Sequence, residues 1–156
     1  MNDAVRVFVR MLSRAYRYED AEQEIISETL LQLSNDYLWD VLFEIMRDNE
    51  AHKRIIESVV EILNYNIEDF TEYSVKKVDI TTYDFSDDMA VEMLNELLKY
   101  EVWMKKYYQH MVDYVESEVL EDVSEDVVRK IRETLEQLVK WEATHINKLT
   151  DLKRKI

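Results

Sequence analysis

Residues 38–63, LWDVLFEIMRDNEAHKRIIESVVEIL, contain the pattern that decides the fold of this chain. Apolar residues recur at alternating intervals of three and four, which keeps their side chains on one stripe of an α-helix. Asn49 and His52 interrupt the apolar series without changing its spacing. The segment therefore predicts a long amphipathic helix, over about 36–63, with two polar groups turned into the core.

Three further segments repeat this spacing and predict helices over about 3–33, 87–117 and 125–154. Short polar stretches separate the first helix from the second and the third from the fourth, so each of these pairs is expected to be antiparallel. Residues 64–86 lose the period and predict a long connection, with one helical turn at about 67–73. The residues available as N-caps are Ser34–Asp36, Ser86–Asp88 and Ser124.

The composition agrees with an all-α fold, expected as one domain over residues 1–156. The chain has no Gly and no Pro, the residues on which tight hairpins and phosphate-binding loops depend. It also has no Cys, so a bound metal must take nitrogen and oxygen ligands. We predict an antiparallel four-helix bundle with one long crossover between the second and third helices. A helical hairpin repeat or a coiled-coil assembly is the alternative, which the aperiodic 64–86 segment disfavours.

The net charge of the chain bears on which partners it can bind. Acidic side chains number 34 and basic ones 20, which gives a net charge of -14 and opposes binding to nucleic acid. No stretch approaches the roughly 18 uninterrupted apolar residues of a membrane span, and the N-terminus lacks the layout of a signal peptide. We therefore expect a cytoplasmic protein that binds neither nucleic acid nor membrane.

Most charged residues fall on the outer faces of the predicted helices, where water solvates them. Ionised carboxylates inside a helical bundle cost several kcal/mol each unless they are paired or bind a metal, so charged and polar residues on the core stripes are informative. Seven carboxyl, amide and imidazole side chains lie on these stripes: Glu19, Glu22, Asn49, His52, Glu101, Glu142 and His145.

Counting from each predicted turn places these groups at matching heights in the bundle. Glu19 lies 16 residues before the turn centred at 35, and His52 lies 17 residues after it. Glu101 lies 21 residues before the turn centred at 122, and Glu142 and His145 lie 20 and 23 residues after it. At about 1.5 Å of rise per residue, the members of each group agree to within about one helical turn.

This layout suits a pair of metal ions. Residues three apart share one helical face, so Glu142 and His145 can reach the same cation. Carboxylates can bridge two cations and imidazole nitrogens can complete each coordination sphere. The second helix carries the variant pair Asn49 and His52. A metal-free alternative is a core ion pair between His52 and Glu19.

The combination resembles the ferritin-like di-iron carboxylate family of the rubrerythrin and bacterioferritin type, over residues 3–63 and 86–154. That family takes one Glu from each of two helices and a Glu-x-x-His from each of the other two. The resemblance implies a ferritin-like bundle that binds two metal ions, iron in the first place, with manganese or zinc as alternatives. It implies terminal carboxylates at Glu19 and Glu101, nitrogen ligands at His52 and His145, and a bridging carboxylate at Glu142.

The sequence departs from the family pattern at Asn49, where a second bridging Glu is expected. An amide oxygen is a weak, neutral ligand, so this position bears on whether one ion or two are bound. Glu22, one turn from Glu19, could substitute, although its height matches less well and it could instead be a salt-bridge partner. His110 lies nine residues from Glu101, on the opposite side of its helix, and is expected at the surface.

By resemblance, the expected activity is that of a di-iron oxidoreductase acting on peroxide or dioxygen. The chain has no Cys-x-x-Cys module, so a separate electron donor is expected. We also expect a homo-oligomer of two or more copies. One alternative is an iron-handling protein that oxidises ferrous iron at the same site. The other is a helical interaction module whose metal site is degenerate.

Overall fold

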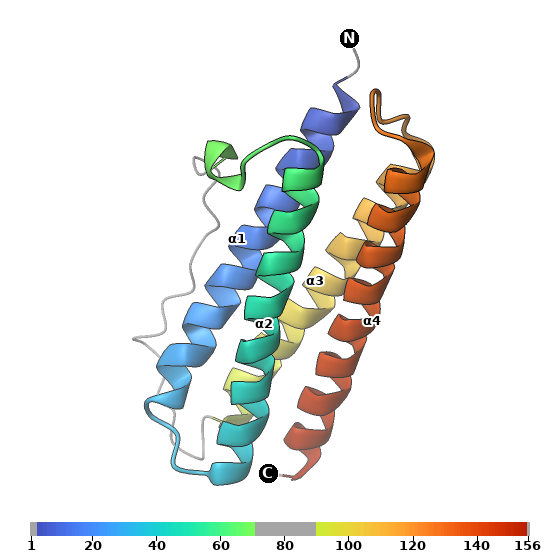
Figure 1. The fold of residues 1–156 in the computed structure, drawn as a ribbon. Helices are drawn as coiled ribbons and strands as arrows, with labels where there is room; N and C mark the ends of the chain where they lie inside the picture. Colours follow the sequence, from blue (N-terminus) through green and yellow to red (C-terminus); the bar gives the residue numbers. More distant parts are fainter. Residues whose placement is uncertain (1–2, 71–89, 156) are drawn as a thin grey trace.

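The computed structural model describes residues 3–70 and 90–155, and within these ranges the chain is helical with no strand. Figure 1 shows the four long helices. They are α1 (Ala4–Leu30), α2 (Asp36–Ile62), α3 (Ala90–Ser117) and α4 (Glu125–Lys155), and a short 3-10 helix, η1 (Ile67–Phe70), follows α2. The predicted all-α fold class is confirmed.

The four helices pack as a bundle built from two pairs. The most extensive contacts join α1 to α2 and α3 to α4, and smaller contacts join α1 to α3 and α2 to α4. Figure 1 shows the two helices of each pair side by side and running in opposite directions. Each helix therefore turns one stripe toward the other three. None of the described helices is long and apolar enough to cross a bilayer.

Capping side chains fix the starts of two helices, as their sequence positions predict. Asn35 Oδ1 accepts hydrogen bonds from the backbone N–H groups of Tyr37 and Leu38, both at 3.0 Å. Ser124 Oγ accepts one from the N–H of Val127 at 3.2 Å. The predicted cap at 86–88 lies outside the described residues.

The first helix is shorter than predicted, since α1 ends at Leu30 rather than near 33. The Leu30 carbonyl accepts a hydrogen bond from the Trp39 indole at 3.2 Å, so a side chain of α2 satisfies a carbonyl group at the helix end. Left-handed backbone at Asn64 (φ 65°) and Asp122 (φ 63°) follows α2 and α3, where Asn and Asp stand in for the absent Gly. The predicted turn at 67–73 is seen as η1 over its described part, Ile67–Phe70.

Two apolar clusters fill the bundle, one toward each end. The first includes Phe8, Leu12, Ile56, Met104 and Leu135, and the second includes Ile26, Leu42, Ile45, Leu94 and Leu149. On every helix, the residues of the first cluster are separated from those of the second by the polar stripe positions named above. The predicted polar residues therefore form one layer between two hydrophobic cores.

Removing the α2 cap tests the turn that sets the register between α1 and α2. We expect Asn35→Ala to lower the free energy of unfolding by about 1 kcal/mol, because two backbone N–H groups lose their acceptor. Asn35→Asp keeps an acceptor and should remain within about 0.5 kcal/mol of the parent. Urea denaturation followed by circular dichroism measures both, and equal losses in the two variants would contradict the capping role.

Candidate metal centre

All seven polar stripe residues are buried, and they come together from the four helices. Glu19 and Glu22 project from α1, Asn49 and His52 from α2, Glu101 from α3, and Glu142 and His145 from α4. None is more than 2% exposed. The control residue, His110, is exposed, as its helical position predicts.

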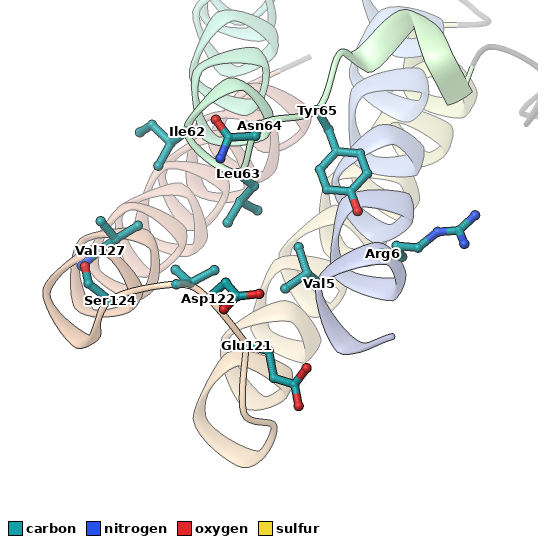
Figure 2. Close-up of a pocket in the computed structure, with 11 residues that line it drawn as sticks. Val5, Arg6, Ile62, Leu63, Asn64, Tyr65, Glu121, Asp122, Ser124 and Val127 are labelled. Atoms are coloured by element: carbon teal, nitrogen blue, oxygen red, sulfur yellow. The ribbon is translucent and has the colours of Figure 1, made fainter. Parts of the chain in front are cut away.

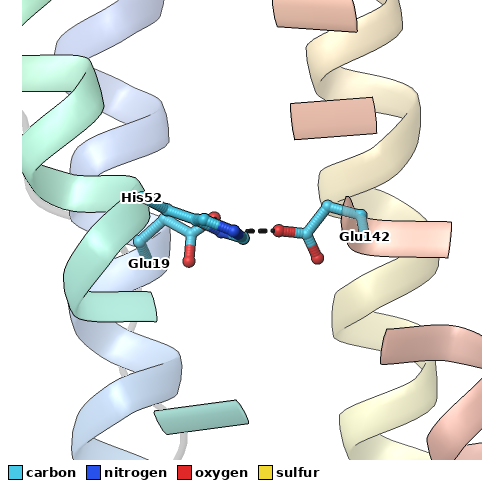
Figure 3. Close-up of side chains that lie close together, drawn as sticks. All are labelled: Glu19, His52 and Glu142. Atoms are coloured by element: carbon cyan, nitrogen blue, oxygen red, sulfur yellow. Dashed lines mark hydrogen bonds and ion pairs between the residues drawn. The ribbon is translucent and has the colours of Figure 1, made fainter. Parts of the chain in front are cut away.

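The first of two Glu/His clusters consists of Glu19, His52 and Glu142, which come from three helices (Figure 3). His52 Nδ1 lies 3.1 Å from Glu19 Oε1 and 3.0 Å from Glu142 Oε1. One ligand atom from each of the three residues lies within 4.8 Å of the others. The two carboxylates therefore converge on the same imidazole nitrogen, so the three side chains could hold one cation between them.

The second cluster joins Glu101, Glu142 and His145, whose ligand atoms also lie within 4.8 Å of one another. His145 Nδ1 lies 3.4 Å from Glu101 Oε2 and 3.8 Å from Glu142 Oε2. The His52 and His145 rings have their centroids 5.7 Å apart and lie nearly parallel, at 24°. Glu142 thus offers Oε1 to the first cluster and Oε2 to the second, the arrangement that a bridging carboxylate requires.

Glu22 and Asn49 face each other across the same layer. Asn49 Nδ2 donates a hydrogen bond to Glu22 Oε1 at 2.9 Å. The Glu22 carboxyl also lies near that of Glu101, and their mutual repulsion adds to burial in raising the pKa of Glu101. Within the described residues, no ion pair with lysine or arginine is found for Glu22, so the structure does not bear out the salt-bridge interpretation.

Two neighbours that the sequence did not single out hold ligand-type atoms in place. The half-buried carboxylate of Asp48 lies 2.9 Å from His145 Nε2, on the ring edge opposite Glu101. Tyr108 Oη donates a hydrogen bond to Glu19 Oε1 at 2.7 Å. Tyr108 lies on the buried stripe of α3, so its position in the sequence could have indicated a contact with the layer. Asp48 lies off the α2 stripe and carries no sequence signal that separates it from a surface acid.

Burial and mutual repulsion set the protonation of the carboxyls. Burial raises the pKa of Glu19 to about 8, and the charge of Glu142 adds to the shift. Burial also raises the pKa of Glu101 and of Glu22 above the ordinary range. Burial acts in the same direction on Glu142, but hydrogen bonds from Glu101 and both histidines outweigh it and lower the pKa of Glu142.

The two histidines hold protons for a related reason. Burial alone lowers the pKa of His52, but hydrogen bonds to Glu142 and Glu19 outweigh it and raise that pKa to about 10. The pKa of His145 is also raised, because its contacts with Glu142 and Asp48 outweigh burial. Protons therefore occupy the interior of the layer and offset its buried negative charge.

Buried oxygens without a hydrogen-bond donor indicate whether the layer could accept cations. Within the described residues, Glu22 Oε2, Asn49 Oδ1 and Glu101 Oε1 are buried and receive no hydrogen bond from a donor. Buried oxygens without a donor are costly, and a hard cation is the partner that such atoms accept. Together with two imidazole Nδ1 atoms, these oxygens form a nitrogen and oxygen set that suits iron, manganese or zinc.

A separate pocket of about 500 Å³ lies at one end of the bundle (Figure 2). Its lining includes Val5 of α1 and Asp122 and Ser124 of the turn before α4. Val5 precedes Glu19 by 14 residues, about 21 Å along the helix. The first apolar cluster lies between them, so the pocket is not an entrance to the polar layer along the bundle axis.

Comparisons with known proteins found no match among family models, curated proteins or solved structures.

Metal binding should depend on pH, because cations must displace the protons that fill the layer. With the pKa of Glu19 raised to about 8 and that of His52 raised to about 10, both groups are protonated near pH 7 and must release protons to act as ligands. We expect the affinity for Mn²⁺ to rise at least about tenfold from pH 6.5 to 7.5, one power of ten per proton released. Calorimetric titration in buffers of different ionisation enthalpy counts these protons. An affinity independent of pH would contradict the assignment.

The three histidines should differ in their effect on metal content. We expect His52→Ala and His145→Ala each to remove about one bound ion, because each imidazole serves one of the two clusters. His110→Ala should bind as many ions as the parent, since His110 is exposed on the outer face of α3. Elemental analysis after loading with ferrous iron under anaerobic conditions measures all three. If the three variants bind equally, the clusters are not the site.

Proposed function

We propose that this chain is a ferritin-like di-metal protein that uses two iron ions to reduce peroxide or dioxygen. The observation that carries the proposal is the position of Glu142, whose two oxygens belong to two separate Glu/His clusters. A structural core needs no such sharing, and a single ion would leave one histidine and one carboxyl idle. Two cations held by one bridging carboxylate account for both clusters.

The bundle supports a ferritin-like connection between the helix pairs. In Figure 1, α2 ends at the end of the bundle where α1 begins, and α3 begins at the opposite end. The chain between Ile62 and Ala90 therefore has to cover the length of a 27-residue helix, about 40 Å. The 27 residues between them, 63–89, could extend to more than twice that length. We assign this segment as the long crossover of a ferritin-like bundle.

The proposed roles of the ligands follow from the two clusters. Glu19 and His52 would hold one ion, Glu101 and His145 would hold the other, and Glu142 would bridge them. Bound iron would supply the two electrons that reduce peroxide to water. The remaining contributions come from the side chains around the ions.

Asp48 and Tyr108 would position the ligands through hydrogen bonds. The Asp48 carboxylate accepts the Nε2 proton of His145, which directs Nδ1 of that ring toward Glu101. Tyr108 Oη holds its proton against Glu19 Oε1 in a fully buried position, where its pKa is raised well above the ordinary value. A neutral phenol beside a ligand can donate a hydrogen bond to a developing negative charge without ionising. The two apolar clusters exclude bulk water above and below the layer.

The electron donor would be a separate molecule, since the chain has no cysteine with which to hold an iron–sulfur centre. Iron handling uses the same clusters and differs only in that ferrous iron is itself the reductant. An interaction module with a degenerate site would retain the buried layer without binding metal.

Metal content and peroxide reactivity test the proposal together. We expect the purified chain to bind two ferrous ions and to gain thermal stability on loading, since ions that bind only the folded state stabilise it. Adding one equivalent of peroxide anaerobically should oxidise both ions, seen as new near-ultraviolet absorbance, whereas Glu142→Ala should give little. Repeated turnover with an added reductant favours the oxidoreductase, and accumulation of ferric product favours iron handling. A chain that binds no metal under these conditions is not a di-iron protein.

A further inference from the structure

We propose that Glu22 is the fourth carboxylate ligand of the di-metal site and that Asn49 is the residue that positions it. On this assignment α1 supplies the negative charge that α2 lacks at position 49. The inference rests on the proposed function, because it concerns the ligands of the same two ions. It goes further by naming a ligand at a helix position outside the family pattern described above.

The contacts of Glu22 place its carboxylate in the metal layer. Glu22 is 2% exposed, although it is an acid on a helix whose outer face is open to water. Asn49 Nδ2 holds Oε1 at 2.9 Å, and the carboxyl lies near that of Glu101, a member of the second cluster. Oε2 receives no donor from any described residue. One oxygen is thus fixed by an amide, and the other is left available to a cation.

Charge gives the reason for a fourth carboxylate. Two divalent ions carry four positive charges, whereas Glu19, Glu101 and Glu142 supply three negative ones. A residual charge of +1 among side chains that are at most 2% exposed is costly, and oxidation to the ferric state would increase it. Glu22 brings the diferrous layer to neutrality. Glu19 and Glu22 are three apart on α1, so both can face the ions from one side.

The same count explains why position 49 is an amide. A glutamate there would add a fifth carboxylate and leave the diferrous layer at −1. It would also bring a second carboxylate against Glu22 Oε1, where Asn49 now donates a hydrogen bond. Asn49 is neutral and is a donor, so it directs Glu22 without adding charge. The fourth carboxylate thus comes from α1 in place of α2, with the total charge of the site preserved.

Exchanging the two residues tests the inference. The probe is Mn²⁺, titrated anaerobically into the 156-residue chain, with stoichiometry from elemental analysis and coupling between the ions from electron paramagnetic resonance. We expect two coupled ions in the parent. Glu22→Gln should weaken the second ion at least about tenfold and remove the coupled signal, because a neutral amide replaces a charged ligand. The double variant Glu22→Gln/Asn49→Glu should recover both ions to within about threefold of the parent.

The control is Glu28→Gln, which removes an exposed acid from the same helix and should bind as the parent does. Gln is nearly isosteric with Glu, and melting curves without metal identify a variant that fails to fold; Glu22→Asp, which keeps the charge, then takes its place and should retain both ions. Two ions bound by Glu22→Gln with parental affinity would overturn the assignment of Glu22 while leaving the di-metal function intact. A double variant that binds as weakly as Glu22→Gln would overturn the inference that a carboxylate from α1 takes the place of one from α2. A parent that binds no Mn²⁺ and no Fe²⁺ would overturn the proposed function as well.

Discussion

The desolvation of four carboxyls in one layer is the constraint on which the rest of this structure depends. Glu19, Glu22, Glu101 and Glu142 are each within 2% of complete burial, and no lysine or arginine contact with them is found in the described residues. Such a layer is stable only if protons or cations neutralise it. The apolar clusters on either side supply the hydrophobic free energy that holds the four helices around it.

The two halves of the layer have different surroundings. His145 has a carboxylate partner, Asp48, at its outer nitrogen. His52 instead meets the edge of the Trp141 ring, with centroids 4.5 Å apart, and its Nε2 has no hydrogen-bond partner among the described residues. A carboxylate behind an imidazole strengthens it as a donor to a metal, and an aromatic ring does not. Two ions bound here would therefore receive different amounts of electron density from their imidazole ligands, and the ion beside His145 would receive more.

The positions of the buried carboxylates indicate that their total charge, and whether their oxygens can reach the same space, determine what the layer can bind. Which helix supplies each carboxylate matters less. A carboxylate from any of the four helices can enter the same space because their inward stripes converge within one turn of each other. Asn49 then becomes informative, since its amide orients a neighbouring carboxylate from α1 rather than replacing one.

The sequence by itself determined the helices, their inward stripes and the polar residues on them, because helical periodicity is a local property that neighbours three and four apart encode. Counting from the turns also matched the height of Glu19 with that of His52, and the height of Glu101 with those of Glu142 and His145, but only the structure showed that the two groups form one layer. Only the tertiary structure showed that Glu142 divides its oxygens between two clusters, that Glu22 meets Asn49, and that Asp48 lies behind His145. These depend on side-chain rotamers and on the rotation of each helix about its own axis, which packing between helices sets and local sequence does not.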